Sequence, residues 1–205
     1  MKKHLLSCIA LLSAASICAQ ENSTNLIIGT YTNSCESKGI YVYGFNTQTA
    51  EVKLKTTSEK IINPSYLTIS DEAKYIYSVN ENGAKSTISS FTFDSKAGLQ
   101  LLNQQDAKGA DPCYIINDKK NVISAAYSGG SISVFKKSID GSLSQVKQVI
   151  QHKGKSVNAQ RQESPHVHMV QFSPDKKFVV ANDLGTDKIY IYKYNPNAEA
   201  KILEI

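Results

Sequence analysis

The sequence predicts an all-β fold, an incomplete β-propeller of about four blades, each a four-stranded antiparallel sheet. A block of four short apolar runs recurs with its first members opening at Pro64, Pro112 and Pro165, which stand 48 and 53 residues apart. The composition is globular, with 205 residues, 41% of them hydrophobic and 20% charged, and this excludes disordered and collagen-like chains. A recurring unit of about fifty residues is typical of a blade, whose sheet buries its faces against its neighbours.

Residues 1–19 have the layout of a secretory signal peptide. Two lysines precede an apolar run that ends near Ala15, and small residues follow it. The run is too short to span a bilayer as an anchor. We expect cleavage after Ala19, export to the periplasm or the exterior, and a single domain over residues 20–205.

Four cysteines are present, two of them in the predicted signal peptide. Acylation of Cys18 in a lipoprotein is the less favoured alternative, because Ile17 is bulky where such signals have a small residue. Cys35 and Cys113 remain, and one bridge in a chain of this length would not make a disulfide scaffold. We expect one exposed and one buried thiol without chemistry, and leave open whether they pair.

The formal net charge is +5, and it falls to +3 once the signal peptide is removed. The lysines are scattered singly or in short pairs at turns, and no basic stripe with interleaved aromatic residues occurs. This pattern does not favour nucleic acid as a partner. Neither a membrane span nor an oligomeric state is predicted.

The four runs of each block are rich in Ile, Val, Tyr, Phe and Thr and lack a helical period, so we expect strands. Turn-forming residues separate them. The successive runs lie at 64–70, 74–81, 86–94 and 99–104, then at 112–118, 121–128, 130–138 and 143–150, then at 165–173, 177–184, 187–195 and 200–205. A β-sandwich with long hairpins is the alternative, but it does not explain why all four runs recur in the same order.

The segment before Pro64 matches the repeat out of phase. Residues 26–32, 39–46 and 51–55 align with the second, third and fourth runs, and the first run is missing. The final run, 200–205, already belongs to the last block and cannot supply it. We therefore expect an open arc from a larger ring, with an unpaired strand edge and an exposed apolar flank.

The densest polar cluster is NAQRQESPHVHM, residues 158–169, where the last innermost strand begins. It holds Arg161, Glu163, His166 and His168. Side chains alternate along a strand, so the two imidazoles should point the same way, toward the mouth of the central channel. Imidazole carries protons near neutral pH, and a guanidinium can bind a carboxylate or phosphate. These four residues are the predicted catalytic residues.

Two other interpretations stay open. The histidines could bond neighbouring loops while Arg161 and Glu163 form a solvated ion pair. A metal would need a third ligand, and His152 is the one other histidine outside the signal peptide; we expect no metal and no cofactor. Polar residues such as Glu81 recur at equivalent turns, which favours a structural role for them.

Several segments together resemble a known family. They are IGTYT (28–32) with GIYVYGF, NPSYLTIS with YSVNE, YSGGSISVF, and above all RQESPHVHMVQFSPD with NDLGTDKIYIY. The chain resembles the seven-bladed propeller lactonases of the 6-phosphogluconolactonase type, which are related to carboxy-muconate cyclases. The resemblance covers nearly all of the mature chain and departs from the family at Ala126, where Asn is usual, and in the short turn INDKKN. It implies a ring of seven blades, of which this chain is the N-terminal portion.

The resemblance also implies a metal-free hydrolase that opens a sugar lactone such as 6-phosphogluconolactone. His166 or His168 would manage the proton while water attacks the carbonyl, and positive groups would stabilise the oxyanion. Arg161 and Glu163 match the family's RQE motif. Further Arg and Glu partners of the histidine are implied beyond Ile205, so we expect little or no activity from these residues alone.

Three alternatives accompany this hypothesis. Export conflicts with a phosphorylated cytosolic substrate, so an unphosphorylated sugar lactone is one of them. A propeller that binds a carbohydrate or a protein without catalysis is the second. A cycloisomerase of the muconate type is the third, and it would transfer a proton without adding water.

Overall fold

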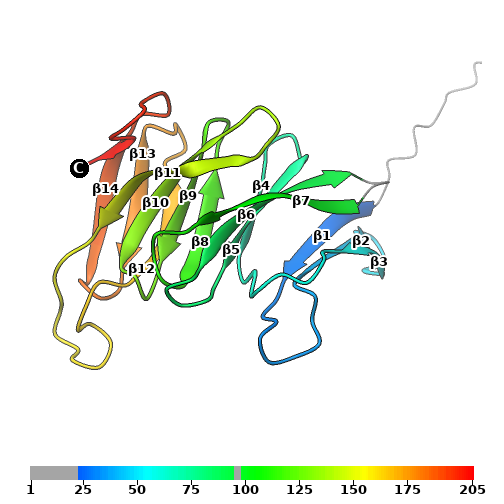
Figure 1. Cartoon of the computed structure of the whole chain (residues 1–205), viewed down its shortest axis with the longest axis horizontal. Helices are drawn as coiled ribbons and strands as arrows, with labels where there is room; N and C mark the ends of the chain where they lie inside the picture. The colour runs from blue at the N-terminus through cyan, green and yellow to red at the C-terminus, as the bar shows by residue number, and fades with distance from the viewer. Residues whose placement is uncertain (1–22, 95–97) are drawn as a thin grey trace, which may run out of the picture.

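The computed structural model describes residues 23–94 and 98–205. Within these ranges the chain has strands and loops but no helix, and the strands form four separate antiparallel sheets set in a row (Figure 1). We number the sheets blades 1 to 4 in chain order. The propeller prediction is confirmed, and the sandwich alternative is wrong, because each sheet packs against the next in the row instead of two sheets closing on one core.

The strand bounds follow the predicted runs closely. Blade 1 contains β1 (Ser23–Gly29), β2 (Ile40–Asn46) and β3 (Val52–Thr57). Blade 2 contains β4 (Leu67–Ile69), β5 (Tyr75–Asn80), β6 (Thr87–Asp94) and β7 (Gly98–Asp106). Blade 3 contains β8 (Pro112–Asn117), β9 (Asn121–Ala126), β10 (Ser131–Lys137) and β11 (Leu143–Gln151). Blade 4 contains β12 (Val167–Phe172), β13 (Phe178–Asp183), β14 (Lys188–Tyr194) and β15 (Leu203–Glu204).

The first strands of blades 2, 3 and 4 lie next to one another. β8 contacts both β4 and β12, so these three strands line one side of the row, as innermost strands do. Blade 1 is three-stranded in the order β1-β2-β3, and no strand among the described residues pairs with the free edge of β1. The missing innermost strand of the first blade is therefore confirmed for this part of the chain.

The hydrophobic core lies between the blades. Ile132 and Val134 of blade 3 pack against Val167 and Val179 of blade 4, and equivalent clusters join blades 2 and 3 and blades 1 and 2. A strand in the middle of the row is covered on both faces, and all six residues of β9 are buried. Neither face of such a strand meets water, so even the polar residues of β9, Asn121 and Ser124, are buried.

The two ends of the row are different. Leu26 and Ile28 are exposed on blade 1, and Ile189 (69% exposed) and Ile191 (57%) on blade 4. These residues occupy sheet faces that have no neighbouring sheet among the described residues. The expectation of exposed apolar flanks is confirmed.

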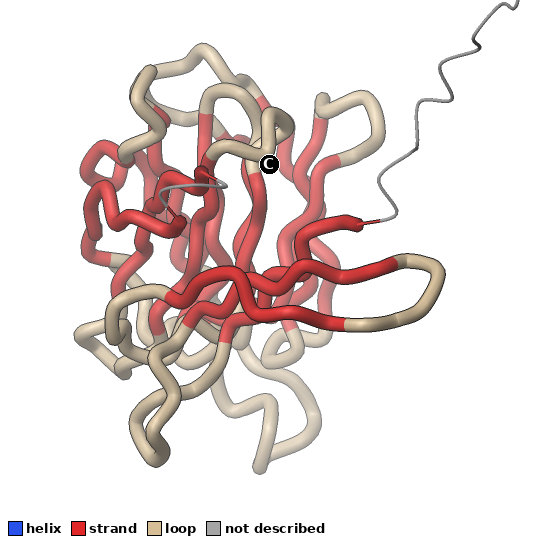
Figure 2. The backbone as a smooth tube through the Cα atoms, turned by 90° about the vertical axis from the view of Figure 1, so that its right-hand side faces the viewer, coloured by secondary structure: helices blue, strands red, loops and turns tan. Residues whose placement is uncertain are grey.

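Figure 2, seen from the blade 1 side, shows the strands of the sheets joined by loops. The predicted signal peptide, residues 1–19, lies outside the described residues. Cys35 is exposed and Cys113 partly buried, and the two are not bonded to each other. No helix in the described part of the chain is long and apolar enough to cross a bilayer.

Candidate functional site

The site is built on a backbone joint that recurs in blades 2, 3 and 4. The acceptor stands just before the innermost strand in blades 3 and 4 and four residues before β4 in blade 2, and the donor is the N–H of the residue just after the second strand. The acceptor and donor pairs are Asn63 and Glu81, Asp111 and Tyr127, and His166 and Leu184, at 3.1, 3.0 and 2.9 Å. We call these six residues the rim. His166 is therefore the rim residue of blade 4 and faces blade 3.

His166 is buried, with 8% of its surface exposed. Its ring stacks on the ring of Tyr127, with the centroids 4.5 Å apart. Its Nδ1 lies 3.0 Å from the carbonyl oxygen of Tyr127, and its Nε2 lies 3.6 Å from Oε1 of Glu163. A carbonyl oxygen only accepts, so Nδ1 carries the hydrogen and Nε2 of the neutral ring presents a lone pair.

His168 meets the same tyrosine in a different way. Its ring lies edge-on to Tyr127, with the centroids 5.6 Å apart, and its side chain is exposed. The pairing of β12 with β13 shifts between Val167 and Met169, so His168 is the extra residue of a β-bulge. Regular alternation, on which the expected common direction of the two imidazoles rested, does not hold here. Both rings contact Tyr127, His166 stacked and buried, His168 edge-on and exposed.

Glu163 and Arg161 lie on the loop 153–165 that leads into β12. The Glu163 side chain is 57% exposed and points its carboxylate at His166. The Arg161 side chain makes no hydrogen bond or ion pair with any described residue, so the alternative of a solvated Arg161–Glu163 ion pair does not hold. Arg161 instead lines an open hollow with His168, on the uncovered side of blade 4. Glu163 thus contacts His166, whereas Arg161 and His168 share only the lining of a hollow.

Two glycines allow the loop to come this close. Gly130 has φ +58°, and a Cβ there would lie 2.5 Å from the Pro165 oxygen. A Cβ on Gly185 would lie 1.7 Å from the Ser164 oxygen. Side chains at either position would push the loop away from Tyr127. The glycines of the YSGG and DLGT segments therefore allow the loop to pack closely against blades 3 and 4.

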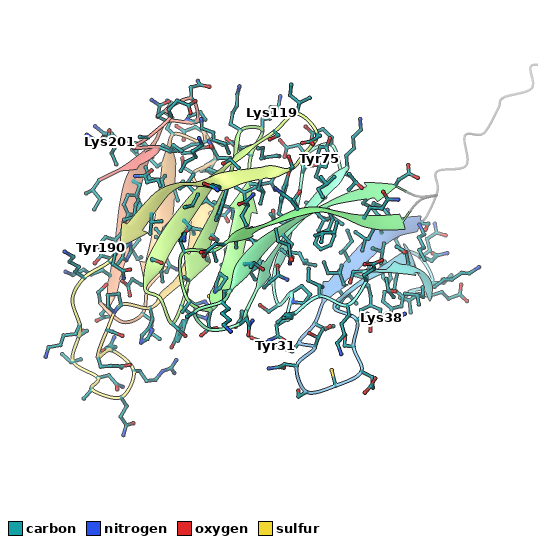
Figure 3. All side chains as sticks on the ribbon, viewed as in Figure 1. Tyr31, Lys38, Tyr75, Lys119, Tyr190 and Lys201 are labelled. Atoms are coloured by element: carbon teal, nitrogen blue, oxygen red, sulfur yellow. The ribbon has the colours of Figure 1, made fainter. Side chains whose placement is uncertain are left out.

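A second polar cluster lies where blades 1 and 2 meet, around the rim residue Glu81. From the sequence, Glu81 was expected to have only a structural role in a turn. Glu81 Oε1 accepts hydrogen bonds from Tyr31 Oη, at 2.9 Å, and from Ser65 Oγ. Burial, and then the neighbouring Glu81 carboxylate, raise the pKa of Tyr31. Figure 3 shows Tyr31 at the lower edge of the row, the same edge at which loop 153–165 hangs in Figure 1. The carboxylate ties two blades together, which a turn residue alone would not do.

Cys113 lies between the two clusters and is partly buried. Its Sγ is 3.4 Å from the His168 oxygen, to which it donates. Burial, and then the charge of Glu81, raise the pKa of the thiol to about 11, so it stays protonated at neutral pH.

Within residues 23–94 and 98–205, no three His, Cys, Asp or Glu side chains stand close enough to hold a metal ion. Sequence analysis did not single out Tyr127, although its position before Gly129-Gly130 in the second run of blade 3 was the available signal.

Known proteins match this chain along most of its length. A family model described as "Lactonase, 7-bladed beta-propeller" matches residues 25–204. The 6-phosphogluconolactonase of Bacillus subtilis is 34% identical over 169 residues, which are 81% of this chain and 48% of the relative. That of Formosa agariphila is 33% identical over 178 residues, 84% of this chain and 50% of the relative.

Solved structures agree. A Bacteroides fragilis protein provisionally named 6-phosphogluconolactonase superposes with a TM-score of 0.86 at 43% identity, covering 90% of this chain and 53% of that one. The periplasmic gluconolactonase of Pseudomonas aeruginosa gives 0.80 at 35% identity, covering 88% and 52%. This chain spans about half the length of these relatives. From the family match and the shared architecture, the chain belongs to the seven-bladed β-propeller lactonase family.

Proposed function

We propose that this chain carries one side of the active site of a sugar-lactone hydrolase. The observation that carries the proposal is the placement of the His166 ring. Its Nδ1–H is held by the Tyr127 carbonyl oxygen, and its Nε2 lone pair faces the Glu163 carboxylate at 3.6 Å. A base oriented in this way, with an anion beside it, can take a proton and hold the resulting imidazolium.

In the proposed reaction a water molecule attacks the lactone carbonyl carbon and gives its proton to His166 Nε2. The C–O bond of the ring then breaks, and the leaving alkoxide takes that proton back, which yields an open-chain hydroxy acid. Arg161 and His168 line a hollow on the uncovered side of blade 4, and in this proposal they offer positive charge and hydrogen bonds to the developing oxyanion. Because the chain spans half the length of its relatives, full turnover in this proposal needs groups from the rest of the propeller.

The proposed substrate is a small sugar lactone. The curated relatives are named for 6-phosphogluconolactone, while the Pseudomonas structure is named a periplasmic gluconolactonase. The predicted signal peptide favours the unphosphorylated lactone, because phosphorylated sugars are cytosolic metabolites. Export itself is part of the proposal.

The test is made in the complete propeller that contains these residues, and it measures acid release from glucono-δ-lactone and from 6-phosphogluconolactone, each above its spontaneous rate. His166→Asn should lower the catalysed rate about a hundredfold or more, and the matched variant His168→Asn should lower it less, because His168 is exposed. Equal rates for wild type and His166→Asn would refute the proposed role.

A sugar-binding protein without turnover is the second candidate. It is favoured by the polar hollow on the rim of blades 1 to 3, about 660 Å³ in volume, which is lined by Tyr31, Asn33, Lys60, Glu81 and Asp111 among others. Gluconolactone binding detected by calorimetry, with no hydrolysis above the spontaneous rate, would favour this candidate.

A further inference from the structure

Three buried polar side chains join blades 3 and 4 and take no part in the proposed chemistry. His152 Nδ1 lies 2.8 Å from Asp183 Oδ2, and His152 Nε2 lies 2.7 Å from the Tyr192 hydroxyl. The side chains of His152 and Asp183 are 2% and 0% exposed. We call these three residues the buried network. Sequence analysis weighed His152 only as a metal ligand.

Asp183 connects the buried network to the candidate site through its second oxygen. Oδ1 accepts the N–H of His166 at 2.8 Å and the N–H of Thr186 at 3.1 Å. Burial opposes ionisation, but these bonds and the one from His152 outweigh it and hold the pKa of Asp183 below its usual range. The carboxylate is therefore anionic at neutral pH, and His152 Nδ1 carries the hydrogen that faces it.

The same carboxylate holds both ends of one loop. His152 follows β11 and His166 precedes β12, so loop 153–165, which carries Glu163, starts and ends at the two residues that Asp183 binds. Between these ends the loop has one more attachment to blade 4, from Gln162 Nε2 to the Leu184 oxygen at 2.9 Å. Asp183 thus fixes where the loop leaves blade 3 and where it enters blade 4.

The buried network has no counterpart at the preceding interfaces. Three positions are equivalent at each interface. The first is the residue that follows the last strand of the earlier blade. The other two belong to the later blade: the last residue of its second strand, and the residue of its third strand that pairs with the second residue of the second strand. They hold Ser58, Asn80 and Phe91 where blades 1 and 2 meet, Ala107, Ala126 and Phe135 where blades 2 and 3 meet, and His152, Asp183 and Tyr192 where blades 3 and 4 meet. An ionised set occurs only where the long polar loop is attached.

We propose that Asp183, backed by His152 and Tyr192, is a positioning residue of the candidate site, whose carboxylate fixes loop 153–165 and so sets Glu163 against the ring of His166. Blades 2 and 3 are joined by apolar packing and by hydrogen bonds such as that from Tyr77 Oη to the Gly141 oxygen, with no ionised set at the three equivalent positions, so such a set is not needed to join two sheets. Burying a carboxylate costs free energy that an apolar set avoids, which fits a role beyond holding the blades together. The inference rests on the proposed function, because the positioned groups are the proposed base and its partner.

The test uses amide exchange and the NMR signals of the His166 ring, neither of which requires turnover. In Asp183→Ala, the amides of Ser156 and Gln162, which are bonded within the loop, should exchange about tenfold faster or more. The Ile61 amide, which bonds Lys38 in a loop of blade 1, should not change. The ring signals of His166 should move as its stacking on Tyr127 loosens.

Asp183→Asn keeps an oxygen for the His166 N–H and should restore most of the loop protection. Tyr77→Phe is the matched control, because it removes a buried hydroxyl bond between blades 2 and 3 and should leave the loop unchanged. Should Asp183→Ala fail to fold, His152→Gln carries the same test. Unchanged loop exchange, equal acceleration at Ile61, or an unmoved His166 ring would overturn the inference. If the lactone assay fails but amide exchange is faster only in loop 153–165, the proposed function is refuted, while the role of Asp183 in fixing the loop stands.

Discussion

The interface between blades 2 and 3 and the interface between blades 3 and 4 differ in kind. At the three equivalent positions the first is apolar, with Ala107 and Phe135 in its core cluster, and the second holds the buried network. Both are well packed, so packing does not require the ionised set. The polar set occurs at the interface where loop 153–165 is attached. Hydrogen bonds are directional and can fix the orientation of a loop, whereas apolar contacts do so far less.

The largest effect is expected from Asp183→Ala. This change makes the position resemble Ala126 of blade 3, but it leaves the N–H of His166 and the ring of His152 without a buried acceptor. Breaking such a set should lower the free energy of unfolding by about 3–5 kcal/mol. Urea unfolding of both proteins measures it.

The triple change His152→Ala, Asp183→Ala and Tyr192→Phe rebuilds the set found between blades 2 and 3. We expect it to cost less than the sum of the three single changes, because the His152 ring and the Tyr192 hydroxyl no longer remain as unpaired partners, although the N–H of His166 still lacks its acceptor. Strict additivity would show that the three side chains act independently.

The next largest effect is expected from acid, which should weaken the interface that contains Asp183 more than the apolar one. The pKa of Asp183 is lower folded than unfolded, so its contribution to stability is present above the unfolded value of about 4 and is lost as the pH falls through the folded value. The free energy of unfolding should therefore fall with acid in this range, and less steeply in Asp183→Asn. Urea melts between about pH 6 and pH 2 provide the comparison. Parallel curves would mean that Asp183 does not titrate with unfolding.

A matched pair of hydroxyl deletions should give smaller effects. Tyr192→Phe leaves His152 Nε2 unpaired and should cost about 1–2 kcal/mol. Tyr77→Phe should cost less, because the Gly141 oxygen that it bonds keeps a second donor, Ser90 Oγ, at 2.7 Å. Equal losses would mean that the hydroxyls act only through packing.

The smallest effect on stability is expected on the open face of blade 4. Ile191→Thr, at a side chain that is already exposed, should change the free energy of unfolding by no more than about 0.5 kcal/mol. It should reduce self-association in sedimentation, because an exposed apolar face favours it. A large destabilisation would show that this face is covered in solution.

Much of the fold could be predicted because the repeat is written in the residue order. The recurrence after Pro64, Pro112 and Pro165 predicted blades 2, 3 and 4, and the out-of-phase segment predicted the three strands of blade 1. The cluster of Arg161, Glu163, His166 and His168 stood out for the same reason, since its members are close in sequence. Their catalytic role stays a prediction.

The parts that could not be predicted depend on register and on contacts over long sequence distances. No local sequence signal predicts the bulge at His168, because the bulge arises from how β12 pairs with β13. Tyr127 reaches the histidines only across a blade interface, and Glu81 gains its role from Tyr31, fifty residues earlier. Asp183 gains its partners His152 and His166 only where blades 3 and 4 meet.

By itself, the sequence determined the kind of sheet, its repetition and the polar loop, because strand periodicity and turn residues are local properties. Only the tertiary structure decided which imidazole is buried beside a carboxylate and which lies in the open. That choice depends on neighbouring blades, whose side chains set the burial and the hydrogen-bond partners of each ring.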